Sequence, residues 1–198
     1  QLCIRDRHMT ISDTFDGEIG RSMAEFSAEY MTHIEGHLDE DLTHVPDRIM
    51  RILRDLDGYV QGFAVSQLQH SLQTATMAER AGADPDIVVA ALCHDIGKWI
   101  SNANHPAIAA EMIRPWVSDK AYWIVKHHQD FQGRHYYARI GLDPEMRRKH
   151  VGHEYYEAAE QFVDEWDQAA FDPDYDTLPL DHFEPLVRET FSRPPKRG

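Results

Sequence analysis

The sequence predicts an all-α protein. Apolar residues recur at intervals of three and four along most of the chain, which is the repeat of one helix face. No segment shows the alternation of a half-buried strand, and Pro, Gly, Ser and Asp residues stand where helices would begin or end. We expect a single helical domain with helices over residues 17–36, 46–56, 65–82, 84–95, 107–113, 118–129, 143–168 and 183–191.

The first predicted helix depends on five apolar residues at helical spacing: Ile19, Met23, Phe26, Tyr30 and Ile34. His33 and His37 near its end are four residues apart, a spacing that can hold one metal ion, but the acidic residues 39–41 beside them favour a solvated helix end. Pro46 suits the first position of the second helix because its fixed φ is already helical. Asp57-Gly58 ends that helix.

Two central helices lead to buried polar residues. The third carries His70 in its first half among apolar positions. The fourth begins with the capping sequence 84–86, which is Asp-Pro-Asp, and continues with the apolar run 87–92. His94–Asp95 follows, and Gly97 stands where the helix would stop, so we expect the His-Asp pair at the helix end.

Polar and proline-rich breaks separate the remaining helices. His105 precedes an alanine-rich helix that Pro115 ends. Residues 129–137 mix aromatic, amide and cationic side chains around a glycine, which predicts either a loop over a site or an aromatic loop packed on the core. Prolines between residues 172 and 179 break the chain before its last helix.

Composition excludes several classes of function. With 42% hydrophobic and 27% charged residues and no long apolar run, we expect neither a membrane span nor a signal peptide. The net charge of -14 disfavours a nucleic-acid partner. Cys3 and Cys93 are far apart, which predicts no disulfide framework and fits a reducing, cytoplasmic setting. The thirteen histidines point to metal binding.

Histidine and aspartate residues near helix ends supply metal-ligand candidates: His70, His94, Asp95, His105, His127 or His128, and Asp167. An isolated His-Asp pair would usually be a hydrogen-bonded core pair. Imidazole and carboxylate groups without thiolates suit iron, manganese or zinc, and a carboxylate can bridge two ions. Neighbouring side chains on a helix point about 100° apart, so two consecutive residues can both reach one metal centre only at a helix end. The set therefore indicates a dinuclear site.

At these residues the chain resembles the HD-domain superfamily of metal-dependent phosphohydrolases and related oxygenases. It looks most like the mixed-valent diiron oxygenases, which include phosphonate-degrading oxygenases and, more distantly, myo-inositol oxygenase. The resemblance is carried by residues 67–73, 82–84, 90–97, His105, His128, 166–168 and 178–180. The matching positions span about residues 47–193 and imply a helical-bundle domain. We expect this domain to cover residues 17–193 with a metal-binding core at about 59–168, preceded by a disordered extension, 1–16, and followed by a tail, 194–198.

The resemblance also implies roles for individual residues. His70, His94 and Asp167 would bind a first iron, Asp95 would bridge, and His105 and His128 would bind the second, with His127 as the rival of His128. Lys98 would lie near the substrate and act in catalysis with Asp95. Tyr59 and Gln67 match pocket positions, and Arg134 with Lys98 could hold an anion. Phe63 stands where the phosphonate oxygenases carry an acidic residue, so the resemblance does not carry a phosphonate substrate over to this chain.

Three functions follow as alternatives. The first is a diiron oxygenase that uses O2 to oxidise and cleave a small polar substrate, hydroxylated or amino and in some cases anionic. The second is a phosphohydrolase of nucleotides or small phosphate esters that uses Mn, Co or Zn. The third is a helical binding module with structural histidines. We expect a small-molecule substrate and no nucleic-acid or membrane partner, and the oligomeric state stays open.

Overall fold

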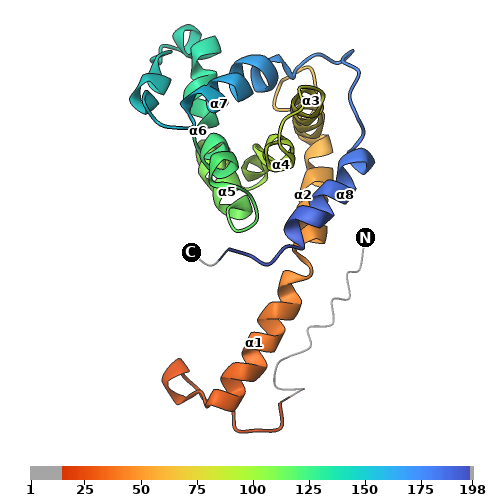
Figure 1. Cartoon of the computed structure of the whole chain (residues 1–198), viewed down its shortest axis with the longest axis vertical. Helices are drawn as coiled ribbons and strands as arrows, with labels where there is room; N and C mark the ends of the chain where they lie inside the picture. The colour runs from red at the N-terminus through yellow and green to blue at the C-terminus, as the bar shows by residue number, and fades with distance from the viewer. Residues whose placement is uncertain (1–14, 197–198) are drawn as a thin grey trace. The chain divides into compact units, whose positions relative to one another are not determined.

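Helices make up the regular structure of the computed structural model, which describes residues 15–196 (Figure 1). This part of the chain contains eight α-helices and no strand, so the all-α prediction is confirmed. The α-helices are α1 Ala28–Leu42, α2 Val45–Asp55, α3 Gln67–Arg80, α4 Pro85–Cys93, α5 His105–Ile113, α6 Asp119–Tyr136, α7 Tyr156–Gln161 and α8 Leu180–Phe191. Residue contacts divide the chain into two compact units, with the division along the chain between His44 and Val45.

The first unit contains a short 3-10 turn, Met23–Glu25, and α1. The predicted helix over 17–36 was wrong in its bounds, because Ser27 is extended and its hydroxyl accepts a hydrogen bond from the Tyr30 amide, which starts the helix there. The helix then continues to Leu42 through the acidic segment that was expected to end it. Of the predicted N-terminal extension, residues 1–14 lie outside the described residues, as do 197 and 198 of the tail.

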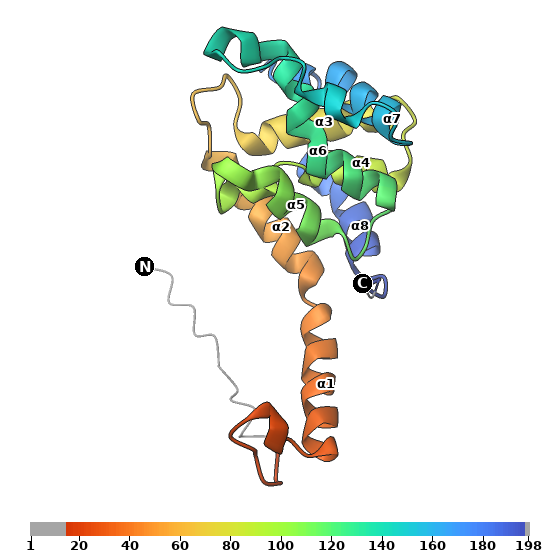
Figure 2. The same cartoon turned by 90° about the vertical axis from the view of Figure 1, so that its left-hand side faces the viewer.

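Helix α4 lies at the centre of the second unit, where it contacts α3, α5, α6 and α8 (Figure 2). Pro85 occupies its first turn after Asp84, and every side chain from Ile87 to Cys93 is buried. A helix that is apolar all round must be enclosed by others. Its C-terminal end, where the His-Asp pair stands as predicted, is therefore held inside the helical bundle.

Helix α6 is longer than expected. The prediction of a loop over 129–137 was wrong, because α6 runs on to Tyr136. His128 and Phe131 continue its buried face, and Gly133 is accommodated where the ring of Tyr137 packs against the helix, so close that a Cβ atom would overlap it. The polar side chains of this segment are thus displayed from a rigid helix.

The predicted helix over 143–168 was wrong as one continuous element. It is divided into a 3-10 turn at Met146–His150, α7, a π-helical turn at Phe162–Trp166 and a 3-10 turn at Asp167–Ala169. Gly152, with φ of 90°, interrupts the chain before α7. A π turn carries one residue more per hydrogen-bonded ring than an α turn, and such turns often occur at functional sites.

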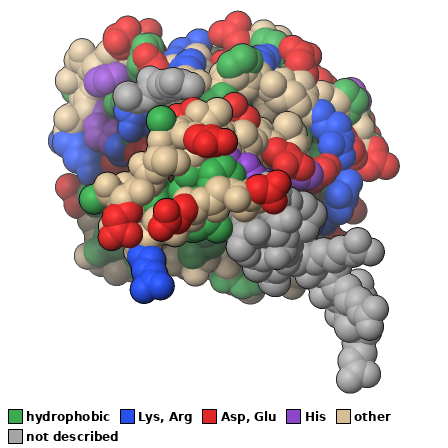
Figure 3. Space-filling model, turned by 90° about the horizontal axis from the view of Figure 1, so that it is seen from below, with side chains coloured by type: hydrophobic (Ala, Val, Ile, Leu, Met, Phe, Trp, Pro, Cys, Tyr) green, Lys and Arg blue, Asp and Glu red, His purple; other side chains and the backbone are tan. Residues whose placement is uncertain are grey.

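The charged side chains on the surface reflect the acidic composition of the chain. Acidic side chains are spread over the face drawn in Figure 3, with lysine and arginine side chains between them. None of the described helices is long and apolar enough to cross a lipid bilayer.

Candidate metal centre

Six buried polar side chains converge from separate elements of the second unit. His70 lies in α3, His94 and Asp95 directly follow α4, His105 begins α5, His128 lies in α6, and Asp167 follows the π-helical turn. None of the six is more than 5% exposed. Burial of so many polar groups requires that they satisfy one another or a bound ion.

The first group consists of His70, His94 and Asp167. The Nε2 atoms of the two histidines are 3.1 Å apart, and Asp167 Oδ1 lies 3.2 Å from the first and 3.5 Å from the second. Three potential ligand atoms are thus directed at one small volume.

The second group consists of His105 and His128, whose Nε2 atoms are 3.4 Å apart. Asp95 connects the two groups. Its Oδ1 lies 3.1 Å and 3.6 Å from the Nε2 atoms of the second group, and its Oδ2 lies 3.4 Å and 3.5 Å from those of the first. Each oxygen of one carboxylate therefore faces its own pair of imidazoles, the arrangement expected of a bridging ligand.

Backbone carbonyls fix the four imidazole rings. The Nδ1 atoms of His70, His94, His105 and His128 lie 2.9, 2.7, 2.9 and 2.7 Å from the carbonyl oxygens of Ala170, Ala91, Asn102 and Val125. A carbonyl oxygen only accepts hydrogen bonds, so each Nδ1 must carry the proton. In the neutral ring the lone pair is then on Nε2, where it can bind a metal ion. A hydrogen bond from the other ring nitrogen to a carbonyl oxygen is typical of histidines that bind metal ions.

These features fit a metal cation. The two Nε2 atoms, 3.1 Å apart, stand at the separation of two ligands of one ion, because ligands about 2.0–2.1 Å from a metal ion lie roughly 2.8–3.4 Å apart at octahedral or tetrahedral angles. The buried oxygens Asp95 Oδ1 and Asp167 Oδ2 accept no hydrogen bond from the described residues. The buried histidine and aspartate groups could thus hold metal, and their nitrogen and oxygen donors suit first-row transition metals.

The electrostatics of the cluster favour positive charge at its centre. Burial disfavours the charged carboxylate of Asp95, yet the neighbouring His94 and Lys98 hold its pKa well below the usual range, and the pKa of Asp167 is lowered in the same way by its histidine neighbours. Burial opposes protonation of His70, but hydrogen bonds to Asp167 and Asp95 raise its pKa to about 9, so a proton competes with a metal ion for its Nε2. Both carboxylates remain ionised at neutral pH, available to a cation.

Lys98 lies at the edge of the cluster, in the 3-10 turn that follows α4. Its ammonium group donates to Asp95 Oδ2 at 2.5 Å and to Gln67 Oε1 at 3.0 Å. Gln67, which was predicted to line the pocket, is fully buried, and its side-chain oxygen holds the Lys98 ammonium group in place. The two residues place one fixed positive charge between the carboxylate and the open space beside it.

His127 points away from the centre. Its Nδ1 is 3.7 Å from Asp130 Oδ2, which also accepts a hydrogen bond from His150 at 2.8 Å, and its ring lies against Trp123. His128 is buried beside Asp95. The geometry therefore favours His128 over His127 as the sixth member of the cluster.

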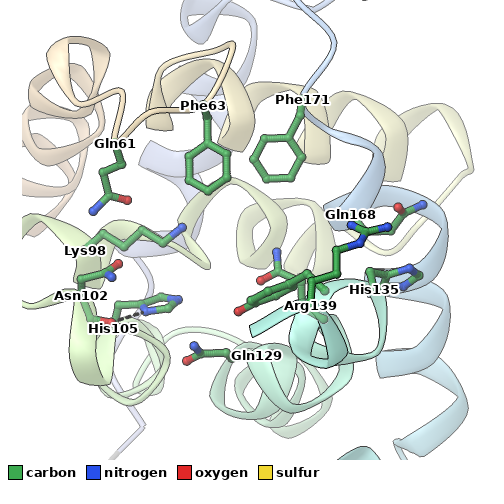
Figure 4. Close-up of a pocket in the computed structure, with 12 residues that line it drawn as sticks. Gln61, Phe63, Lys98, Asn102, His105, Gln129, His135, Arg139, Gln168 and Phe171 are labelled. Carbon is green, nitrogen blue, oxygen red and sulfur yellow. Dashed lines mark hydrogen bonds between the residues drawn. The ribbon is translucent and has the colours of Figure 1, made fainter. Parts of the chain in front are cut away.

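A cavity of about 710 Å³ adjoins the cluster (Figure 4). Lys98 is the only predicted substrate-binding residue that lines it in the described part of the chain. Tyr59, Gln67 and Arg134 do not, and Arg139 supplies the cavity's guanidinium instead. The full lining is Gln61, Phe63, Lys98, Asn102, His105, Gln129, Gln132, His135, Tyr136, Arg139, Gln168 and Phe171.

Sequence reasoning singled out the mixed segment 129–137 but assigned a role to only one of its members, Arg134. Four of them line the cavity because one side of α6 faces it: Gln129, Gln132, His135 and Tyr136. Phe171 was missed altogether. Its ring stacks on His70 with centroids 4.4 Å apart and meets Phe63 at 5.0 Å, so an aromatic pair covers the first ligand group.

A comparison with protein-family models agrees with this geometry. The sequence model of the HD domain family matches residues 68–169, which is 102 of the 198 residues and includes all six members of the cluster. A search of curated proteins found no match to the chain.

Proposed function

Because the chain belongs to the HD domain family, whose members are generally metal-dependent enzymes, we propose that it binds two metal ions and uses them in catalysis. His70, His94 and Asp167 would hold one ion, His105 and His128 the other, and Asp95 would bridge. The observation that carries the proposal is the position of the Asp95 carboxylate, with each oxygen facing a separate pair of imidazoles.

The reaction we propose is that of a diiron oxygenase acting on a small polar substrate. Two mixed-valent iron ions would supply the one-electron chemistry and the activation of O2. The nitrogen and oxygen donor set suits iron, and the ligand-bearing segments resemble those of the diiron oxygenases. The chain itself would exclude water with the Phe63 and Phe171 rings, and Lys98 would stabilise negative charge on a substrate oxygen.

A phosphohydrolase is the second candidate. The observation in its favour is Lys98, because an ammonium group fixed beside a bridging carboxylate is well placed to stabilise charge on a phosphoryl oxygen. Manganese, cobalt or zinc in the same cluster would then lower the pKa of bound water.

Metal content and reactivity distinguish the two candidates. The protein would be loaded with Fe(II) without oxygen, then partly oxidised and studied by low-temperature EPR. A coupled mixed-valent signal, together with O2 uptake on addition of a polyol, amino alcohol or hydroxy acid, is the expected result. If the Mn, Co or Zn protein instead releases phosphate from nucleotides and the iron protein consumes no O2, the oxygenase proposal is wrong and the hydrolase proposal stands.

A further inference from the structure

The cavity beside the ligand cluster lacks acidic side chains. The chain has 34 aspartate and glutamate residues against 20 lysine and arginine residues, yet none of the twelve lining residues is acidic and two are cationic. Positive charge on the wall of a cavity attracts anions even when the whole protein is negative. The lining thus differs in charge from the rest of the molecule.

The two cations stand on opposite sides of the cavity. Figure 4 shows Lys98, Asn102 and His105 on one side and Arg139, His135 and Gln168 on the other, with the Phe63 and Phe171 rings above. Lys98 is already bonded to Asp95 and Gln67. Arg139 forms no hydrogen bond or ion pair with any described residue, while the nearby Arg134, Arg147 and Arg148 all pair with carboxylates.

Neighbouring carboxylates do not neutralise Arg139. Asp164, in the π-helical turn, accepts hydrogen bonds from His135 at 2.8 Å and from the buried Arg147 at 3.1 Å. Its backbone oxygen accepts a further bond from the Gln168 side chain at 3.1 Å. Asp164 therefore fixes two lining residues, His135 and Gln168, while Arg147 offsets its charge, and the guanidinium of Arg139 stays available to a ligand.

We propose that Arg139 binds an oxyanion, a carboxylate or phosphonyl group, at the end of the substrate remote from the reacting atoms. This inference rests on the proposed function in taking the anion to be part of that enzyme's substrate. A guanidinium group can donate two parallel hydrogen bonds to such an anion. The substrate would then extend across the cavity toward Lys98 and His105, past five carboxamide side chains that can bond hydroxyl or amino groups: Gln61, Asn102, Gln129, Gln132 and Gln168.

Binding of simple anions tests the proposal without turnover. Acetate and methylphosphonate, with ethylammonium as the cationic control, would be titrated against the full-length protein by NMR, after metal removal with chelator and again after loading with Zn(II). The acetate and methylphosphonate arms separate the two kinds of oxyanion. Arg139→Gln is the test variant, and Arg148→Gln is its control, because Arg148 pairs with Glu145 and does not line the cavity.

We expect wild type and Arg148→Gln to bind at least one anion equally, Arg139→Gln to bind it about tenfold more weakly, and ethylammonium to bind to none of them. Anion binding should persist in the metal-free protein. Equal affinity in Arg139→Gln, or binding that requires Zn(II), would overturn the proposal. Failure of the metal proposal would show as loss of metal binding with anion binding intact, so the two failures are distinguishable.

Discussion

Gly97 is in direct contact with the backbone of His105. A Cβ atom on this glycine would overlap the His105 carbonyl oxygen, so the turn after His94 and Asp95 can approach the start of α5 only because residue 97 has no side chain. The contact joins the segment that supplies the bridging carboxylate to the one that supplies an imidazole of the second group.

Gly97→Ala should therefore push α5 away from the turn. We expect a loss of about 1–3 kcal/mol in the free energy of unfolding and a lower occupancy of the ion at His105 and His128. Denaturant titration and metal analysis check both. Gly58→Ala is the control, because nothing lies within 4 Å of the added carbon, and it should change stability by less than about 1 kcal/mol.

Asp95→Ala should lose both metal ions, since it removes the oxygens that face both imidazole pairs. Asp167→Ala removes an oxygen from the first group only and should keep about one ion per chain. Metal content after gel filtration measures the difference. Two ions retained by Asp95→Ala would contradict the bridging assignment.

The choice between adjacent histidines can be tested directly. His128→Ala should reduce the metal content from two ions to one, because its Nε2 faces Asp95 inside the cluster. His127→Ala should leave the metal content unchanged, because that ring contacts Trp123 and Asp130 outside it. The opposite pattern would make His127 the ligand.

Asp130 should contribute a pH-dependent part of the stability. Burial disfavours its charged form, but hydrogen bonds from His127, His150 and Lys149 hold its pKa below the ordinary value of 3.8. As pH falls below that value the unfolded chain takes up a proton before the folded chain does, so this stability is present above about pH 4 and lost below it.

We expect Asp130→Asn to lower the unfolding free energy by about 1 kcal/mol at pH 7, a figure reduced for solvent screening. The difference from wild type should shrink as pH falls below about 4, as measured by urea unfolding across the pH range. Asp174→Asn, at an exposed position, is the control. A difference that stays constant down to pH 3 would show that the ionised carboxylate is not responsible.

Local signals were sufficient to predict much of this protein. The prolines at 46 and 85 lie in the first turns of α2 and α4, and the apolar run before His94 is buried as its composition indicated. The six expected ligands converge in the structure. Residue type and position, at a helix end or for His70 inside a helix, identified the candidates, and the resemblance to the HD-domain superfamily chose His128 over His127.

The cavity was harder to predict because it depends on long-range packing. Arg139 and Arg134 have the same side chain, but Arg134 lies within α6 and Arg139 lies in the 3-10 turn after it, and Arg139 is the one that lines the cavity. The contact of Phe171 with His70 joins residues 101 positions apart. The π-helical turn has no local signal, since an α-helix would be compatible with the same side chains.

The π-helical turn at Phe162–Trp166 sets the direction of Asp167 without changing which residues of the turn pack in the core. Phe162, Val163 and Trp166 are buried in the core, while Asp164 holds the cavity wall and Asp167 reaches the ligand cluster. A regular α turn with the same core contacts would rotate Asp167 by about 100° for the one residue gained or lost. The number of residues in this turn therefore sets the direction of the Asp167 side chain. A chain one residue shorter here would keep its hydrophobic core but lose the Asp167 carboxylate from the ligand cluster.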